Sequence, residues 1–227
     1  GMLSWLLVAV PAVTALVTYR DVLTGHWEFV YDDNHNFVDI LEISYERLRW
    51  YFSEAMVLGV YEPLSLTLKA LFVHFVGWDP DAFHTLAYYL HAANAGLAYL
   101  LGQRLLSLLL GGDQAVEGPE ACTAVVVARS QGRGIRGGRC GAIGDGEAVV
   151  GLGCALGAAL FACQPCSTQV VCWASCLPYL FAGFLAPLAL LALLQAHRCE
   201  EAGAGVLRVA SLLCWRAVAA LLYLAAV

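Results

Sequence analysis

Two adjacent carboxylates, Asp32 and Asp33, lie in a polar stretch that follows the first apolar segment of the chain. A carboxylate can remove the proton of an attacking hydroxyl, and a pair of them can hold a divalent cation. On spacing alone the pair also fits an ordinary hydrated loop near lipid headgroups. We take Asp32 and Asp33 as candidate catalytic residues and ask which elements would hold them.

Two histidines, His84 and His91, are seven residues apart and share one face if residues 83–110 form a helix. His84 is a candidate for contact with a phosphate or an acceptor near the membrane surface. An ionisable residue inside a membrane span is a functional candidate. The alternative for both residues is a hydrogen bond between helices, which a neutral His91 makes at little cost.

Nine cysteines are present, and four of them follow one another at short spacing: Cys163, Cys166, Cys172 and Cys176. Four thiolates can bind zinc tetrahedrally, and the first two could form a disulfide across a short loop. The segment is apolar and offers no histidine, which favours cysteines that pack as small buried hydrophobes. We therefore expect no metal at these cysteines.

The composition is that of a membrane protein. Hydrophobic residues make up 60% of the 227 residues and charged residues only 13%, compared with about 25% charged residues in soluble domains. Eleven of the 18 carboxylates lie between Asp21 and Asp81. No basic tract indicates nucleic acid binding.

A membrane span needs about 20 apolar residues, and on this basis we predict a single all-α membrane domain over residues 1–227. It is a polytopic helix bundle of about five spans, connected by a polar loop at 20–82 and a Gly- and Arg-rich insert at 111–147 that we expect to be disordered. The predicted spans are 3–19, 83–110, 148–163, 170–194 and 206–227.

Residues 61–78 predict a further helix that does not cross the membrane. Glu62-Pro63 is a typical helix start, and one face carries an apolar stripe formed by Leu64, Leu68, Leu71, Phe72 and Phe75. Such a stripe suits an amphipathic helix lying in the membrane interface. The basic residues favour a cytoplasmic insert, with Asp32-Asp33 on the opposite, lumenal or periplasmic side.

Several motifs occur in an order that resembles a known family. They are Phe29-Val-Tyr-Asp-Asp33, Tyr61-Glu-Pro-Leu64, Gly77-Trp-Asp-Pro80, Phe83-His84, Leu90-His-Ala-Ala-Asn-Ala95, Phe161-Ala-Cys-Gln-Pro165 and Val171-Cys-Trp-Ala-Ser175. The chain resembles the amino-terminal membrane half of the transmembrane and tetratricopeptide-repeat proteins, which are C-type (GT-C) glycosyltransferases related to protein O-mannosyltransferases. That family has about twice as many spans, followed by repeats of 34 residues, so the resemblance implies an incomplete GT-C-like fold.

The resemblance implies transfer of mannose from a polyprenyl-phosphate sugar, such as dolichyl-phosphate-mannose, to a Ser or Thr hydroxyl of a protein. Asp32 would be the base or would position the acceptor, and Asp33 would orient the acceptor or bind a divalent cation. Substrate-binding roles would fall to His84, Tyr61, Gln164 and Gln169. Membrane lipid is the further expected partner. The location would be the endoplasmic reticulum or the bacterial inner membrane.

The turn after the third predicted span departs from the family pattern. Relatives carry a His, a basic residue and an acid there, whereas this chain has Gln164, Ser167 and Gln169. Glutamine forms hydrogen bonds but carries no charge. A catalytically inactive membrane scaffold that keeps the fold is therefore the alternative. A small transporter has less support, because the acids lie in a loop and not along the spans.

Overall fold

The computed structural model describes residues 2–30, 33, 41–57, 59–111, 140–201, 211 and 213–221. The regular structure in these residues is helical, apart from one isolated β-bridge between Val57 and Val60. The all-α prediction is confirmed for this part of the chain. Asp32, most of the 111–147 insert and much of the predicted span 206–227 lie outside the described residues.

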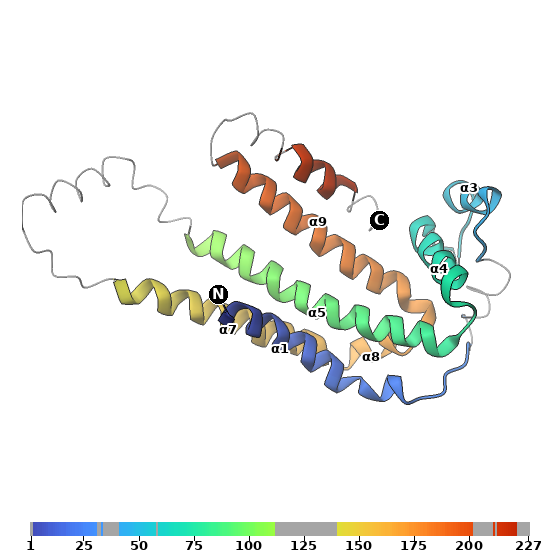
Figure 1. Ribbon diagram of the computed structural model, residues 1–227, viewed down its shortest axis with the longest axis horizontal. Coiled ribbons are helices and arrows are strands. Elements are labelled where there is room, and N and C mark those ends of the chain that lie inside the picture. The colour runs from blue at the N-terminus through green and yellow to red at the C-terminus, as the bar shows by residue number, and fades with distance from the viewer. Residues whose placement is uncertain are drawn as a thin grey trace, which may run out of the picture.

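Four long helices form the body of the molecule (Figure 1): α1 (Met2–Thr18), α5 (Pro80–Gly111), α7 (Cys140–Cys163) and α9 (Leu177–Glu201). α5 is central and packs against the other three, and α1 also packs against α7. The short elements η1 (Arg20–Leu23), α8 (Cys166–Val171) and η2 (Ala174–Cys176) contact α5 as well. The four long helices therefore form one bundle.

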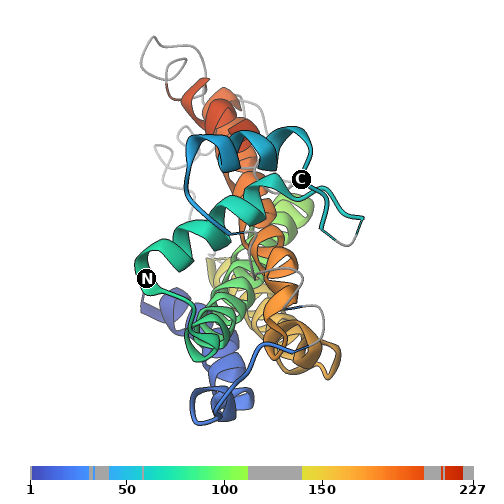
Figure 2. The same ribbon diagram turned by 90° about the vertical axis from the view of Figure 1, so that its right-hand side faces the viewer.

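Two shorter helices, α3 (Tyr45–Ser53) and α4 (Pro63–Val76), lie at one end of this bundle (Figure 2). Ser44 caps α3, because its hydroxyl accepts a hydrogen bond from the Arg47 backbone N–H at 3.2 Å. Pro63 begins α4 and Gly77, with φ +92°, ends it. A positive φ at this position strongly favours glycine.

Small side chains fill the space between α1, α5 and α7. One buried cluster consists of Ala15, Ala92, Ala95 and Ala162. A Cβ atom on Gly151 would lie 3.1 Å from the Leu7 side chain, so the two backbones approach closely there. Larger apolar side chains point outward, for example Leu6, Val10, Val13 and Val17 on α1 and Val149, Leu152, Leu156 and Leu160 on α7.

A second apolar cluster holds α4 against the bundle. It joins Leu66 and Ala70 of α4 to Phe83 of α5 and to Ala174 and Leu177 at the beginning of α9. The first turn of α9 is thus fixed between α4 and α5. The polar segments of the sequence also come together at this end of the bundle.

Among the described residues, one helical stretch, Ala174–His197, is long and apolar enough to cross a membrane. Only 22% of its most apolar window is buried within the chain. Three other apolar helical stretches are shorter: Leu6–Thr18, Pro63–Val76 and Ala148–Cys163. The fourth predicted span therefore coincides with a candidate membrane helix, and the other four remain predictions.

The observed boundaries differ from the predicted ones in two places. The segment 170–194 is not one helix, because the chain turns at Cys172–Cys176 before α9 begins at Leu177. Pro178 lies in the first turn of α9, where its missing N–H has no partner to lose. In addition, α7 begins at Cys140, so its first residues come from the segment that we expected to be disordered.

Candidate functional site

Asp33 is buried, with a relative exposure of 1%. One of its carboxylate oxygens accepts hydrogen bonds from the Ser175 backbone N–H at 2.8 Å and from the Ser175 hydroxyl at 2.5 Å. The other oxygen accepts from the Val30 N–H at 3.1 Å. Asp33 therefore attaches the acidic loop, the polar segment that carries Asp32 and Asp33, to the turn that precedes α9. The two hydrogen-bonded residues are 142 positions apart in the chain.

Lys69 lies on the inner face of α4 and its side chain is fully buried. Its Nζ atom forms an ion pair with Oε1 of Glu62 at 3.1 Å. Burial lowers the pKa of Lys69, and this effect is opposed mainly by Glu62 and also by the nearby Asp33 and Cys176. The buried ammonium and two carboxylates thus belong to one electrostatic cluster at the end of the bundle.

His84 is also buried at this end, in the first turns of α5. Its Nδ1 atom lies 2.7 Å from the Pro80 carbonyl oxygen, and its Nε2 atom lies 3.3 Å from the Cys172 carbonyl oxygen. A neutral imidazole has a single N–H and can donate to only one of them. The ring also stacks on Trp27, with centroids 4.4 Å apart, so its orientation is fixed on three sides.

Trp27, at the beginning of the acidic loop, connects this loop to α5. Its backbone N–H donates to the Asp81 carboxylate at 2.7 Å, and its indole N–H donates to the Val22 carbonyl at 2.8 Å. The loop is therefore held at Trp27 by α5 and at Asp33 by the turn before α9. Asp32 directly precedes the second of these two fixed points.

The structure thus brings two predicted site residues to the same turn. Asp33 binds Ser175, and His84 approaches the carbonyl of Cys172, three residues earlier. Both contacts fall in the motif Val171–Ser175. The convergence joins three segments that are distant in sequence: the acidic loop, the start of α5 and the α8–α9 turn.

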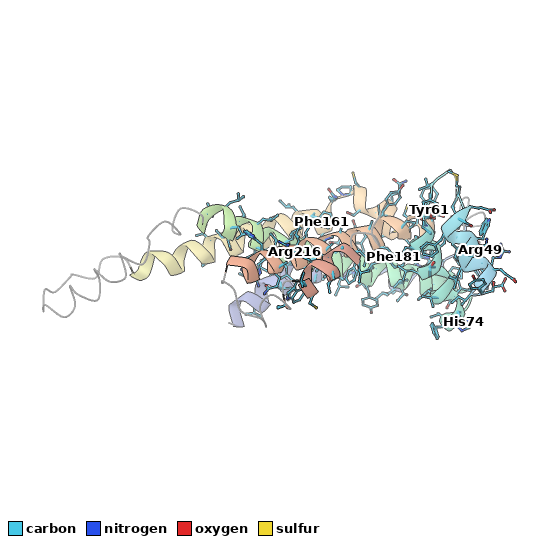
Figure 3. All side chains as sticks on the ribbon, turned by 90° about the horizontal axis from the view of Figure 1, so that it is seen from above. Arg49, Tyr61, His74, Phe161, Phe181 and Arg216 are labelled. Carbon is cyan, nitrogen blue, oxygen red and sulfur yellow. The ribbon has the colours of Figure 1, made fainter. Side chains whose placement is uncertain are left out.

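The other predicted substrate-binding residues are exposed. Tyr61 is 49% exposed and its hydroxyl donates to the Phe52 carbonyl at 2.8 Å. Figure 3 shows Tyr61 at the same end of the molecule as Arg49 and His74. The side chains of Gln164 and Gln169 are exposed on the α7–α8 turn and on α8. The Gln164 backbone carbonyl accepts from the Tyr19 hydroxyl at 3.0 Å.

His91 has the role of a helix-to-helix contact. Its Nε2 atom lies 2.9 Å from the Ala162 carbonyl of α7, and its ring packs edge-on against Tyr19, the residue between α1 and η1. It therefore connects α5 to α7 and to the residue that follows α1. Of the two readings that the sequence left open for His91, this geometry favours the structural one.

Within the described part of the chain, no three His, Cys, Asp or Glu side chains are grouped so that they could hold a metal ion. Among the described cysteines, Cys163, Cys166, Cys172 and Cys176 are not disulfide-bonded. The cation expected near Asp32 and Asp33 stays a prediction, because Asp32 lies outside the described residues.

Sequence reasoning did not assign roles to Ser175, Lys69 and Glu62. One signal was present for Lys69, the only acidic or basic residue apart from His74 in the apolar segment 63–76. A lone charge in such a segment needs a buried partner. Ser175 carried no local signal, because its partner lies far away in the sequence.

Comparison of the chain with protein-family models, with curated proteins and with solved structures finds no match.

Proposed function

We propose that the chain is a C-type membrane glycosyltransferase, or part of one, that transfers mannose from a polyprenyl-phosphate sugar to Ser or Thr hydroxyls of proteins. The observation that carries the proposal is the buried carboxylate of Asp33, fixed by Ser175 at the beginning of the candidate membrane helix. A carboxylate pair anchored there would lie at the level where a lipid-linked headgroup leaves the bilayer.

The proposed membrane bundle includes α1, α5 and α7 as well as α9. In support, α1 and α7 turn valine and leucine side chains outward, with relative exposures from 43% to 70%, whereas alanines lie between the helices. Small residues at the contacts and large apolar residues outside are typical of helices that pack in lipid. The membrane would be that of the endoplasmic reticulum or the bacterial inner membrane, with the acidic loop in the lumen or periplasm.

The proposed reaction is a single displacement at the anomeric carbon. The acceptor oxygen forms a bond to that carbon as the bond to the polyprenyl phosphate breaks, and a carboxylate takes the hydroxyl proton. Asp33 already accepts three hydrogen bonds, so it is better suited to hold the loop than to remove the proton. We assign the base to Asp32 and a positioning role to Asp33.

His84 would complete the site on the side of α5. Its ring stacks on Trp27 and lies within hydrogen-bond distance of two backbone carbonyls, so it can line the site without rearranging. Exposed Tyr61, Gln164 and Gln169 would contact the acceptor or the donor from the rim. Glutamine can bind sugar hydroxyls but supplies no charge for a phosphate.

A transfer assay with lipid-linked mannose and Ser/Thr peptides tests this proposal. Asp32→Asn is expected to abolish most of the transfer, whereas Asp21→Asn is the matched control, because the Asp21 side chain is 92% exposed and forms a surface ion pair with Arg20. Equal transfer by both variants would remove Asp32 from the mechanism.

A scaffold that has lost the chemistry is the second candidate. The specific observation in its favour is the uncharged α7–α8 turn, where Gln164 and Gln169 are exposed. On this reading the Asp33–Ser175 contact serves folding alone. Turnover by the purified chain would exclude the scaffold, and its absence in a correctly folded chain would favour it.

A further inference from the structure

Helix α4 has an inverted distribution of polar and apolar side chains. Its buried face includes Ser65 at 8% exposure and Lys69 at 0%, together with Leu66 and Ala70. In a helix on the surface of a soluble protein, the charged side chain would lie on the solvent side.

The outward side of α4 is mainly apolar, with His74 as an exposed polar residue in its last turn. Leu64, Leu68, Leu71 and Phe75 recur at the spacing of one helix face, and this is the side away from Ser65 and Lys69. Leu71 is 38% exposed and Phe75 is 79% exposed. The sequence identified this stripe; the structure exposes Leu71 and Phe75 and leaves Leu64 and Leu68 half-buried.

Two observations indicate what covers this face. First, the lysine of α4 points inward and pairs with Glu62, so the outer side of α4 carries no lysine, arginine, aspartate or glutamate. Second, α4 packs through Leu66 and Ala70 onto Ala174 and Leu177, which are the first residues of the candidate membrane helix. α4 is therefore fixed at the depth where that helix enters the apolar layer.

The end of α4 adds the side chains that prefer a membrane interface. Val76 is 49% exposed and Trp78, just beyond Gly77, is 47% exposed. His74 lies at the periphery of the molecule in Figure 3. Tryptophan and tyrosine side chains are enriched at the headgroup level of a bilayer.

We propose that the outer face of α4, defined by Leu64, Leu68, Leu71 and Phe75, lies in one leaflet of the bilayer in contact with lipid acyl chains. The helix runs along the interface, with Ser65 and Lys69 on the side of α4 that faces the bundle. The polar cluster is consequently separated from lipid by the thickness of one helix. The inference concerns a lipid-facing surface and does not depend on sugar transfer.

Photochemical crosslinking of the full chain in phospholipid vesicles tests this proposal. Phe75→p-benzoylphenylalanine places a benzophenone on the outer face; under light its ketone takes a hydrogen from a nearby C–H group, and the two carbons then join, leaving an alcohol. The control is the same substitution at Tyr45, which is 81% exposed and lies at the start of α3 beside charged residues.

The expected result is a covalent phospholipid adduct at residue 75, detected by mass spectrometry, at a yield several-fold above that at residue 45. A crosslink from residue 75 to another protein molecule would overturn the proposal, because a protein would then cover the face. Equal lipid yields at the two positions, or no lipid adduct at residue 75, would also overturn it. Because no activity is measured, failure here is distinguishable from failure of the transfer assay.

Discussion

Replacing Lys69 by Met tests the buried ion pair most sharply. The Lys69 side chain is fully buried and the Glu62 side chain is 12% exposed, with 3.1 Å between Nζ and Oε1. Methionine has a similar length but no charge, so Lys69→Met leaves the carboxylates of Glu62 and Asp33 without the buried ammonium that attracts both. Removing one partner of a buried pair costs about 3–5 kcal/mol, and the expected loss in the free energy of unfolding lies at the lower end of this range, because burial disfavours the charged form of Lys69 and offsets part of the ion pair.

The double variant Lys69→Met, Glu62→Gln removes the second charge as well. It is expected to regain most of the loss, because no uncompensated charge of the pair is left buried. The measurement is reversible unfolding in mixed micelles, arranged as a double-mutant cycle. Wild type, both single variants and the double variant complete the cycle.

A surface ion pair provides the matched control. Arg20 and Asp21 are 3.6 Å apart, with side chains 75% and 92% exposed. Arg20→Met is expected to cost no more than about 1 kcal/mol. If Lys69→Met costs as little as this, or if the double variant is no more stable than Lys69→Met, the argument for a buried compensated cluster is wrong.

Three further predictions concern single residues: Ser175, Gly77 and Lys69. Ser175→Ala removes the hydroxyl bound to Asp33 and is expected to cost about 1.5–3 kcal/mol of stability, while Ser175→Thr keeps the hydroxyl and most of the stability; equal losses would contradict the role of the hydroxyl. Gly77→Ala places a side chain at φ +92° and is expected to cost about 1–3 kcal/mol in the same unfolding assay; an unchanged stability would contradict the strain. Burial lowers the folded-state pKa of Lys69 below 10.5, so the unfolded chain binds more protons between the folded value and 10.5, and stability rises with pH across that window. Lys69→Met should lose this rise, and a variant that keeps it would show that another group causes it.

Local sequence pattern predicted the helices well where periodicity and capping act within one segment. The stripe of α4, its start at Pro63 and its end near Gly77 follow from neighbouring residues. The break at Cys172–Cys176 was missed, because an apolar run hides a turn whose hydrogen bonds are made with other segments. Pro178 does not mark this break, because it lies within the first turn of α9.

The candidate site was only partly predictable for the same reason. Asp33 and His84 were selected by residue type and motif, and they do meet at one turn. Ser175 and Lys69 became visible only when the fold brought α4 and the α8–α9 turn against the acidic loop. Tyr61, Gln164 and Gln169 were selected by motif alone, and the contacts that the structure gives them are backbone contacts or lie at the surface.

The most direct measurement is the configuration of the sugar product. Purified chain in vesicles would be given a polyprenyl-phosphate mannose of one defined anomer and a Ser/Thr peptide, and the product anomer would be read by nuclear magnetic resonance. A single displacement assisted by one carboxylate base predicts a product of inverted configuration. Retained configuration, or no glycopeptide from a chain that is folded, would contradict the account.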